Sequence, residues 1–173
     1  MEEVSVGTAW KKKYPEQIGL AVTVDAEGTA NVIALGWVMP TSGSPPMVAI
    51  SIGHGRYSHE LIRQCKEFVL AFPNEDQGKE MLFCGSKSGR EVNKQKESGF
   101  VFVPARQVKP PLIQGAVANL ECKLVSQHET GDHTIFVGEI LTAHVEEGKG
   151  RLYTLGGGDF GGVRPIKKIR INE

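Results

Sequence analysis

The sequence predicts a mainly β protein, a mostly antiparallel β-barrel decorated by two or three short helices. Many short runs are rich in Val, Ile, Leu and aromatic residues, which favour strands. Glycine, proline or aspartate bounds these runs, as expected for a chain that turns often. In chain order the predicted strands are QIGLAVTV, ANVIALGWV, MVAISI, EFVLAF, GAVANLECKLVSQ, TIFVGEILTAHV and RLYTL.

Two segments between these runs have the composition of hairpin turns. DAEG, residues 25–28, joins the first two predicted strands. HETGDH, residues 128–133, is the second turn, and its Gly131 suits a positive φ. The segment from Val117 to Val145 is therefore predicted to be one long antiparallel hairpin.

Helical signals are few. Ser58 to Lys66 predicts one short helix, with Ser58 as its N-cap and an apolar face that includes Leu61 and Ile62. Asp76 to Phe83 predicts a second helix, and a third, weaker signal follows Gly89.

Length and composition indicate one globular domain over residues 1–173. Lysine plus arginine equals aspartate plus glutamate, at 20 each, which argues against nucleic acid as the main partner. Cys65, Cys84 and Cys122 have no metal-ligand spacing and are expected to be reduced thiols. We find no apolar segment of signal-peptide or membrane-span length, so we expect a soluble cytoplasmic protein.

The stretch SIGHGRYSHELI, residues 51–62, is the first candidate for function. A strand ends in flexible glycines, and Arg56, Tyr57 and Ser58 follow where the predicted helix begins. The free N–H groups of a helix start bind anions, above all phosphates, and an arginine adds a bidentate donor. The alternative is a solvated Arg56 beside a capping Ser58, and these residues alone favour it slightly.

The stretch CGSKSGREVNK, residues 84–94, is the second candidate. Small residues surround Lys87, and Arg90 follows, so the loop can present N–H groups and cations to a second side of a phosphate. It is not a Walker A loop, because Gly85 and Gly89 are too close together. A mobile, solvated loop is about equally compatible with these residues.

Two other stretches favour ordinary structure when taken alone. GWVMPTSGSPP, residues 36–46, offers backbone and hydroxyl groups to a flat polar ring, but an ordinary strand connection explains it better. GGGDFG, residues 156–161, matches G-x-G-x-x-G, yet only 12 residues follow it and a βαβ unit needs about 30. We expect a flexible loop there.

The sequence shows no acid–base or nucleophilic machinery of its own. The five histidines, at positions 54, 59, 128, 133 and 144, form no H-x-H or HExxH pattern, so no metal site is expected. No G-x-S-x-G elbow is present. An enzyme with this sequence therefore needs a cofactor that carries the chemistry.

The order of these stretches along the chain is more specific than any one of them. NVIALGWVMPTSGSPPMVAISI, RYSHELI, EFVLAFP, GSKSGREVNK and GDHTIFVGEI follow one another. The series resembles the flavin-reductase-like family of FMN-binding split barrels, in particular its ferric-reductase and flavoredoxin branch, over residues 15 to 160. The resemblance implies an antiparallel split β-barrel of Greek-key type.

The resemblance implies that two groups of residues hold the phosphate of FMN. The group at the strand end and helix start is Ser51, Arg56, Tyr57 and Ser58. The group that closes over the phosphate and ribityl chain is Lys87, Ser88 and Arg90.

The resemblance also implies which residues meet the isoalloxazine ring. The strand end along the ring is Gly36, Trp37, Val38, Met39, Pro40, Thr41 and Ser42. It leaves open whether Trp37 packs on the ring or lines the core. His133 is implied near the open face of the flavin, where it positions nicotinamide. The glycine-rich tail does not align with the family, which leaves the roles of Tyr153 and Phe160 open.

Two functions from different classes follow from the resemblance. The first is an enzyme in which NAD(P)H passes a hydride to FMN N5, and electrons then reach free flavin, a ferric chelate or a protein acceptor. The second is a non-enzymatic FMN-binding electron carrier of flavoredoxin type. A split-barrel module for another ligand is a third possibility. The resemblance implies a homodimer with FMN near the subunit interface.

Overall fold

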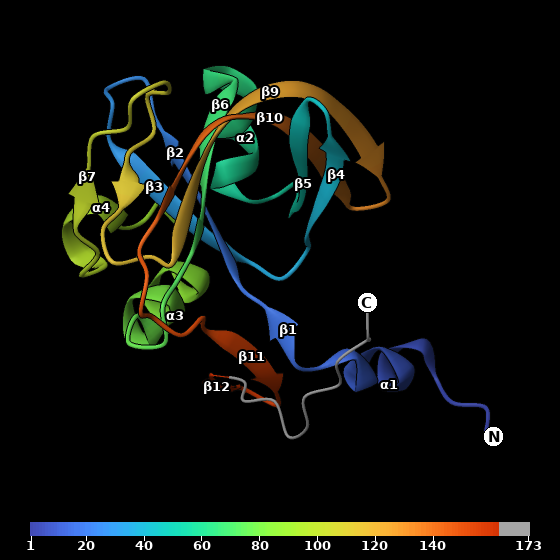
Figure 1. Cartoon of the computed structure of the whole chain (residues 1–173). Coiled ribbons are helices and arrows are strands. Elements are labelled where there is room, and N and C mark those ends of the chain that lie inside the picture. The colour runs from blue at the N-terminus through green and yellow to red at the C-terminus, as the bar shows by residue number, and fades with distance from the viewer. Residues whose placement is uncertain (163–173) are drawn as a thin grey trace, which may run out of the picture.

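The computed structural model describes residues 1–162, and the main body is an antiparallel β-barrel (Figure 1). The strands are β1 (Glu16–Gln17), β2 (Gly19–Val24), β3 (Ala30–Leu35), β4 (Val38–Gly43), β5 (Pro46–Gly53), β6 (Glu67–Phe72), β7 (Phe102–Val103), β8 (Leu112–Ile113), β9 (Ala118–Thr130), β10 (His133–Val145), β11 (Tyr153–Gly156) and β12 (Asp159–Gly161). The helices are α1 (Val6–Trp10), the 3₁₀ turn η1 (Lys11–Lys13), α2 (Tyr57–Cys65), α3 (Gly78–Ser86) and α4 (Lys94–Glu97).

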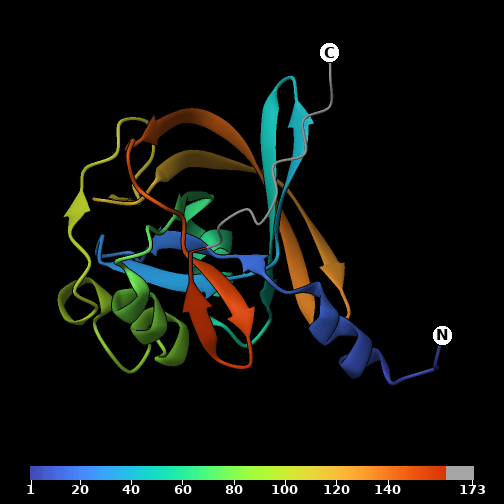
Figure 2. The same ribbon diagram turned by 60° about the horizontal axis from the view of Figure 1, so that its bottom comes forward.

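Seven strands form the barrel sheet in the order β3-β2-β6-β9-β10-β5-β4, and every neighbouring pair is antiparallel. The predicted mainly β class is confirmed. The predicted long hairpin is also confirmed, since β9 and β10 pair along their length and Gly131 turns between them with a φ of +54°. This hairpin curves across both views of the molecule (Figures 1 and 2).

The core lies on both sides of the sheet, which explains the continuous apolar runs. All six residues of β2 are buried. Leu20 and Val22 pack into one cluster with Met81 and Ile113, while Ala21 faces a second cluster. A strand that is buried on both faces needs apolar residues at consecutive positions rather than at alternate ones.

Helix α2 confirms the predicted helix to within one residue at each end. It ends where Lys66 adopts a left-handed conformation and donates its N–H to the Ile62 carbonyl. The prediction that Ser58 caps the helix is wrong, because Arg56 is the N-cap residue and Ser58 lies inside the first turn. The Ser58 hydroxyl accepts a hydrogen bond from Asn31 instead.

The second predicted helix, 76–83, begins and ends later than expected, at Gly78 and Ser86. The Asn74 side chain accepts the Asp76 N–H at 2.7 Å, and this local turn keeps Asp76 out of the helix. The weak third signal corresponds to α4, which Asn93 caps. Helix α1 was not expected from the sequence; Ser5 caps it, and it lies outside the barrel in both views (Figures 1 and 2).

The run ANVIALGWV is two strands rather than one. The chain breaks after β3 at Gly36, where any Cβ would lie 2.7 Å from a carboxylate oxygen of Glu16. Val38 then starts β4, which pairs with β5 as a separate hairpin that projects beyond the barrel in Figure 2. Residues 36–46, expected to be an ordinary strand connection, therefore contain the strand β4 and a short turn before β5.

The segment 156–161 is a hairpin, so the expectation of a flexible loop is wrong. Strands β11 and β12 pair antiparallel, and Gly156, Gly157 and Gly158 have φ values of +90°, +66° and +97°. A run of glycines is suited to a turn in which consecutive residues take positive φ.

Two further observations bear on the expected class of protein. The three cysteines are unpaired thiols. No helix in the described part of the chain is long and apolar enough to cross a membrane.

A buried carboxylate fixes the long loop before β8 to the barrel. Glu121 on β9 is fully buried and accepts the backbone N–H groups of Arg106, Gln107 and Val108 at 2.6–3.2 Å. His144 lies 2.7 Å from the same carboxylate. Burial alone would raise the pKa of Glu121, but these hydrogen bonds outweigh it and hold the pKa below its usual value.

Glu121→Gln is expected to lower the free energy of unfolding by about 1–3 kcal/mol, because the amide loses the charge and turns a donor toward buried N–H groups. A group with a lowered folded-state pKa stabilises the fold above its unfolded pKa, and that stability is lost as the pH falls. The difference in the free energy of unfolding between wild type and variant should therefore shrink below about pH 4. Urea unfolding at several pH values measures this, with the exposed Glu147→Gln as control. A gap that stays constant with pH would contradict the assignment.

A cationic cavity beside the start of α2

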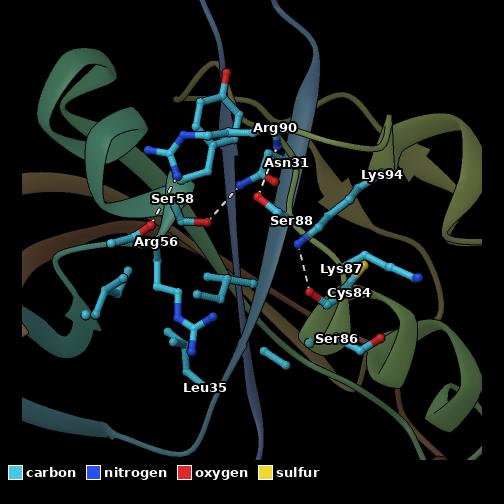
Figure 3. Close-up of a pocket in the computed structure, with 18 of the residues that line it drawn as sticks. Asn31, Leu35, Arg56, Ser58, Cys84, Ser86, Lys87, Ser88, Arg90 and Lys94 are labelled. Atoms are coloured by element: carbon cyan, nitrogen blue, oxygen red, sulfur yellow. Dashed lines mark hydrogen bonds between the residues drawn. The ribbon is translucent and has the colours of Figure 1, made fainter.

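A cavity of about 620 Å³ opens between β3, the end of β5, the start of α2 and the segment that follows α3. Figure 3 shows side chains from β3, the start of α2 and the segment that follows α3 around it. The lining residues from α2 and the segment after α3 are mostly polar or cationic, and those from β3, the turn after it and β5 are mostly apolar. Its volume is within the range of about 300–1,000 Å³ that is usual for small-molecule sites.

Arg56 lines the cavity from the N-cap of α2. Its side chain extends from the helix start toward Leu35 (Figure 3). Among the described residues, no side chain makes a capping hydrogen bond to the first turn of α2. The free N–H groups of that turn and the guanidinium together form a site suited to an anion.

Ser58 and Asn31 belong to the polar part of the lining. The Asn31 amide donates to the Ser58 hydroxyl at 2.7 Å, and both side chains are buried. The Asn31 carbonyl oxygen Oδ1 is buried without a partner among the described residues. A buried acceptor without a partner costs about 1–3 kcal/mol, so its position in a cavity is consistent with a ligand that donates to it.

Arg90 holds the 86–90 loop against the start of α2. Its guanidinium donates to the Gly55 carbonyl at 3.1 Å and to the Glu60 carboxylate at 3.0 Å, and it lies 5.0 Å from the centre of the Tyr57 ring. Gly89 approaches so closely that a Cβ there would overlap Asn31 Oδ1. The two predicted anion-binding stretches are therefore adjacent in the fold.

Lys94, the last residue of the candidate stretch 84–94, is a cavity residue that was not among the predicted site residues. It is 96% buried, and its ammonium donates to the carbonyls of Val32 and Cys84, each at 2.7 Å. Burial lowers the pKa of Lys94 and raises the pKa of the Cys84 thiol to about 11. Lys87 extends away from Arg56 in Figure 3, so Lys94 supplies the second inward-facing cation.

The part of the lining that comes from the barrel strands is less polar. The residues that line it from β3, the following turn and β5 are Ile33, Ala34, Leu35, Gly36, Trp37, Ile52 and Gly53. Trp37 is 46% exposed, and its ring centre lies 4.7 Å from that of His133. The structure thus places Trp37 at the cavity rim rather than in the core.

His133 begins β10 beside the hairpin tip and lines the cavity. Its Nδ1 lies 2.6 Å from the Asp132 carboxylate, and the pairing of β10 with β5 sets it opposite Gly53. Contact with His133 holds the pKa of Asp132 below its usual value. A carboxylate at Nδ1 favours a proton on that nitrogen.

Most of the predicted site residues meet in this cavity although they are up to 97 positions apart in the chain. Those that line it are Gly36, Trp37, Ser51, Arg56, Tyr57, Ser58, Lys87, Ser88, Arg90 and His133. The remaining predicted residues belong to β4 and do not line it in the described part of the chain: Val38, Met39, Pro40, Thr41 and Ser42.

The charges of the cavity favour an anion. Among the described residues that line it, Arg56, Lys87, Arg90 and Lys94 carry positive charge, and Glu91 is the single carboxylate. A ligand with an anionic group at one end and a flat, mostly apolar ring at the other end matches this distribution.

Comparisons with known proteins agree with the fold. A family model described as flavin reductase like domain matches residues 11–163. The chain belongs to the flavin-reductase-like family. An FMN-binding protein from Thermus thermophilus superposes with a TM-score of 0.86 at 26% identity, covering 99% of this chain and 100% of that one. A flavoredoxin from Methanosarcina acetivorans superposes with a TM-score of 0.82 at 29% identity, covering 98% and 95%.

Two sequence relatives complete the comparison within the flavin-reductase-like family. An uncharacterized protein of Archaeoglobus fulgidus is 46% identical over 118 residues, 68% of this chain and 66% of its own. An NADH-dependent FAD reductase of Streptomyces globisporus is 34% identical over 100 residues, 58% of this chain and 54% of its own. The chain thus matches about two thirds of the first relative's length and about half of the second's.

Proposed function

We propose that the chain binds FMN in this cavity and reduces it with NADH or NADPH. One observation carries the proposal. The cavity combines a helix start without a side-chain cap and inward-facing cations with an apolar surface that has Trp37 at its rim. FMN has one phosphate and one planar ring system, separated by a polar chain. Relatives in the family include an FMN-binding protein and an NADH-dependent reductase.

The phosphate end would be held by Arg56, by the first-turn N–H groups of α2 and by Ser58. The Ser58 hydroxyl accepts from Asn31 and so keeps its own hydrogen free to donate. Ser51, Tyr57, Lys87 and Ser88 complete the group expected from the sequence. Arg90 would act chiefly by holding the two loops together, because its guanidinium is already bonded to Glu60 and Gly55.

The ring end would lie against the turn at Gly36 and Trp37, with backbone groups of the segment 36–42 toward its polar edge. His133 would orient a nicotinamide beside it without moving a proton. Bound FMN would supply hydride acceptance at N5, so the protein needs no general base of its own. What the chain contributes is positioning and exclusion of water.

A second candidate function is a non-enzymatic electron carrier that exchanges electrons with a partner protein. It is favoured by the similarity to a flavoredoxin over nearly the whole chain. The two candidates share the FMN site and differ only in whether nicotinamide has access to the ring. The carrier needs no positioning residue for a donor.

An anaerobic titration separates the two functions. The FMN-loaded protein should lose its visible flavin absorbance on addition of NADH or NADPH. Dithionite serves as the control, because it reduces bound flavin in either case. If both nicotinamides leave the flavin oxidised while dithionite bleaches it, the enzyme is rejected and the carrier takes its place.

We also propose that two copies of this single domain associate. Exposed apolar side chains occur on β4, β9 and β10, namely Met39, Val125, Leu141 and Val145, which are 40–71% exposed. Exposed apolar side chains along the strands of one sheet suit a surface that a partner covers. Light scattering at micromolar concentration should give twice the chain mass of 18.8 kDa. A mass of one chain would contradict the dimer.

A further inference from the structure

A cluster of three metal-ligating side chains lies outside the flavin cavity. His54, His59 and Glu129 bring one ligand atom each to within 4.8 Å of the other two. They line a neighbouring cavity with Glu60, Arg63, Gln64 and Arg90, and Arg90 is the one lining residue that the two cavities share among those described. No linear sequence motif predicts this cluster, because its members come from a turn, a helix and the end of a strand.

The fold holds these side chains in place through short hydrogen bonds. His54 Nε2 lies 2.8 Å from the Glu129 carboxylate. Thr134 donates to that carboxylate at 3.0 Å, and its Oγ1 lies 2.8 Å from His59 Nε2. The backbone contributes too, since Glu129 and Thr134 are paired across β9 and β10 and the His54 N–H donates to the Asp132 carbonyl.

The side-chain chemistry suits metal binding. Since Thr134 donates its hydroxyl hydrogen to Glu129, its oxygen accepts from His59 Nε2, which leaves Nδ1 of His59 as the nitrogen with a free lone pair. Burial and the nearby His54 lower the pKa of His59, and the hydrogen bond from Thr134 lowers the pKa of Glu129. Two imidazoles and one carboxylate form a ligand set that binds Zn²⁺ and other divalent transition metals.

We propose that His54, His59 and Glu129 form a binding site for one divalent transition-metal ion, with Zn²⁺ as the probe. Metal–ligand distances of about 2.0–2.2 Å require ligand atoms about 3–4 Å apart, so the widest pair must close by about 1 Å. His54 and Glu129 provide this movement, because their side chains are 43% and 59% exposed while His59 is fixed in the core. The neighbouring cavity leaves a fourth position open to water.

The local charges are compatible with a cation at this site. Arg90 is paired with Glu60 at 3.0 Å, which leaves Arg63 as the remaining cation of the cavity lining described above. Glu129 supplies the opposing charge. The site is independent of the proposed function, since none of the three ligands lines the flavin cavity.

Calorimetric titration of the tag-free, flavin-free protein with Zn²⁺ tests the site. We expect one equivalent to bind, and His54→Ala and Glu129→Gln each to weaken that binding at least about tenfold. Both changes are at exposed side chains, so the fold should persist, and far-UV circular dichroism checks this. His128→Ala is the matched control, since His128 is an exposed histidine on the same hairpin. Its variant should bind Zn²⁺ like wild type.

Titration with Co²⁺ gives an independent readout, because its visible spectrum reports the coordination number. We expect bands of four- or five-coordinate Co²⁺ in wild type and their loss in His54→Ala. Absence of Zn²⁺ binding would overturn the proposal. Equally weakened Zn²⁺ binding in His54→Ala and His128→Ala would also overturn it, because binding would then belong to surface histidines in general. Unchanged Zn²⁺ binding in Glu129→Gln would overturn it too.

Discussion

Arg56→Ala is expected to weaken FMN binding about 10- to 100-fold and to leave the fold intact. Arg56 is exposed and lies at the N-cap of α2, where its side chain extends into the cavity toward Leu35. A hydrogen bond to a charged group contributes about 1.5–3 kcal/mol, which corresponds to that range of affinity. Quenching of flavin fluorescence gives the dissociation constant.

The control for Arg56→Ala is Arg106→Ala, which removes an exposed arginine far from the cavity and keeps the backbone N–H that Glu121 accepts. Thermal unfolding of the flavin-free proteins should be the same for wild type and both variants. An unchanged FMN affinity in Arg56→Ala would mean that the residue is merely solvated. A collapsed flavin-free protein would mean that its role is structural.

His133→Ala is expected to slow flavin reduction by NAD(P)H roughly 10- to 100-fold, because a misplaced donor ring loses the benefit of orientation. The FMN affinity should change little, since His133 lies beside Trp37 and is not one of the cations proposed to meet the phosphate. Stopped-flow reduction under anaerobic conditions measures the rate at saturating nicotinamide.

His128→Ala serves as the control for His133→Ala, because it removes an exposed imidazole from the same hairpin without touching the cavity. A wild-type reduction rate in His133→Ala would reject the positioning role. A parallel loss of FMN affinity and rate would instead indicate that His133, with its contact to Trp37, supports the flavin itself.

Local signals in the sequence were sufficient for the barrel. The turn at Gly131, the long hairpin and helix α2 follow from composition and periodicity over a few residues. The two candidate anion-binding stretches were visible locally, because glycine, serine and cationic residues concentrate in each, but only the family resemblance favoured them over ordinary structure. Their adjacency is a property of the fold, which sets Gly89 against Asn31.

The errors arose where a contact between distant residues decides the local structure. Ser58 has the composition of an N-cap, but Asn31, 27 residues away, engages its hydroxyl. Lys94 looks like an ordinary surface residue of a polar segment, yet it is buried against the carbonyl of Val32, 62 positions earlier. Such long-range hydrogen bonds have no periodicity that a sequence can display.

The break at Gly36 has the same origin. The chain from Ala30 to Val38 is uniformly suited to a strand, and only the carboxylate of Glu16 in contact with Gly36 marks the point where β3 ends and a new strand begins. The predicted contacts of Val38 to Ser42 with the flavin ring stay a prediction. Those residues pair with β5 outside the described cavity lining.

The affinity of the protein for FMN compared with riboflavin tests the central claim most directly. The two molecules share the ring and ribityl chain and differ only in the phosphate, which Arg56, Ser58 and the start of α2 are proposed to meet. Loss of more than one charge-assisted hydrogen bond predicts that FMN binds at least about 100-fold more tightly than riboflavin in a fluorescence-quenching titration. Equal affinities for FMN and riboflavin would contradict the assignment of this cavity.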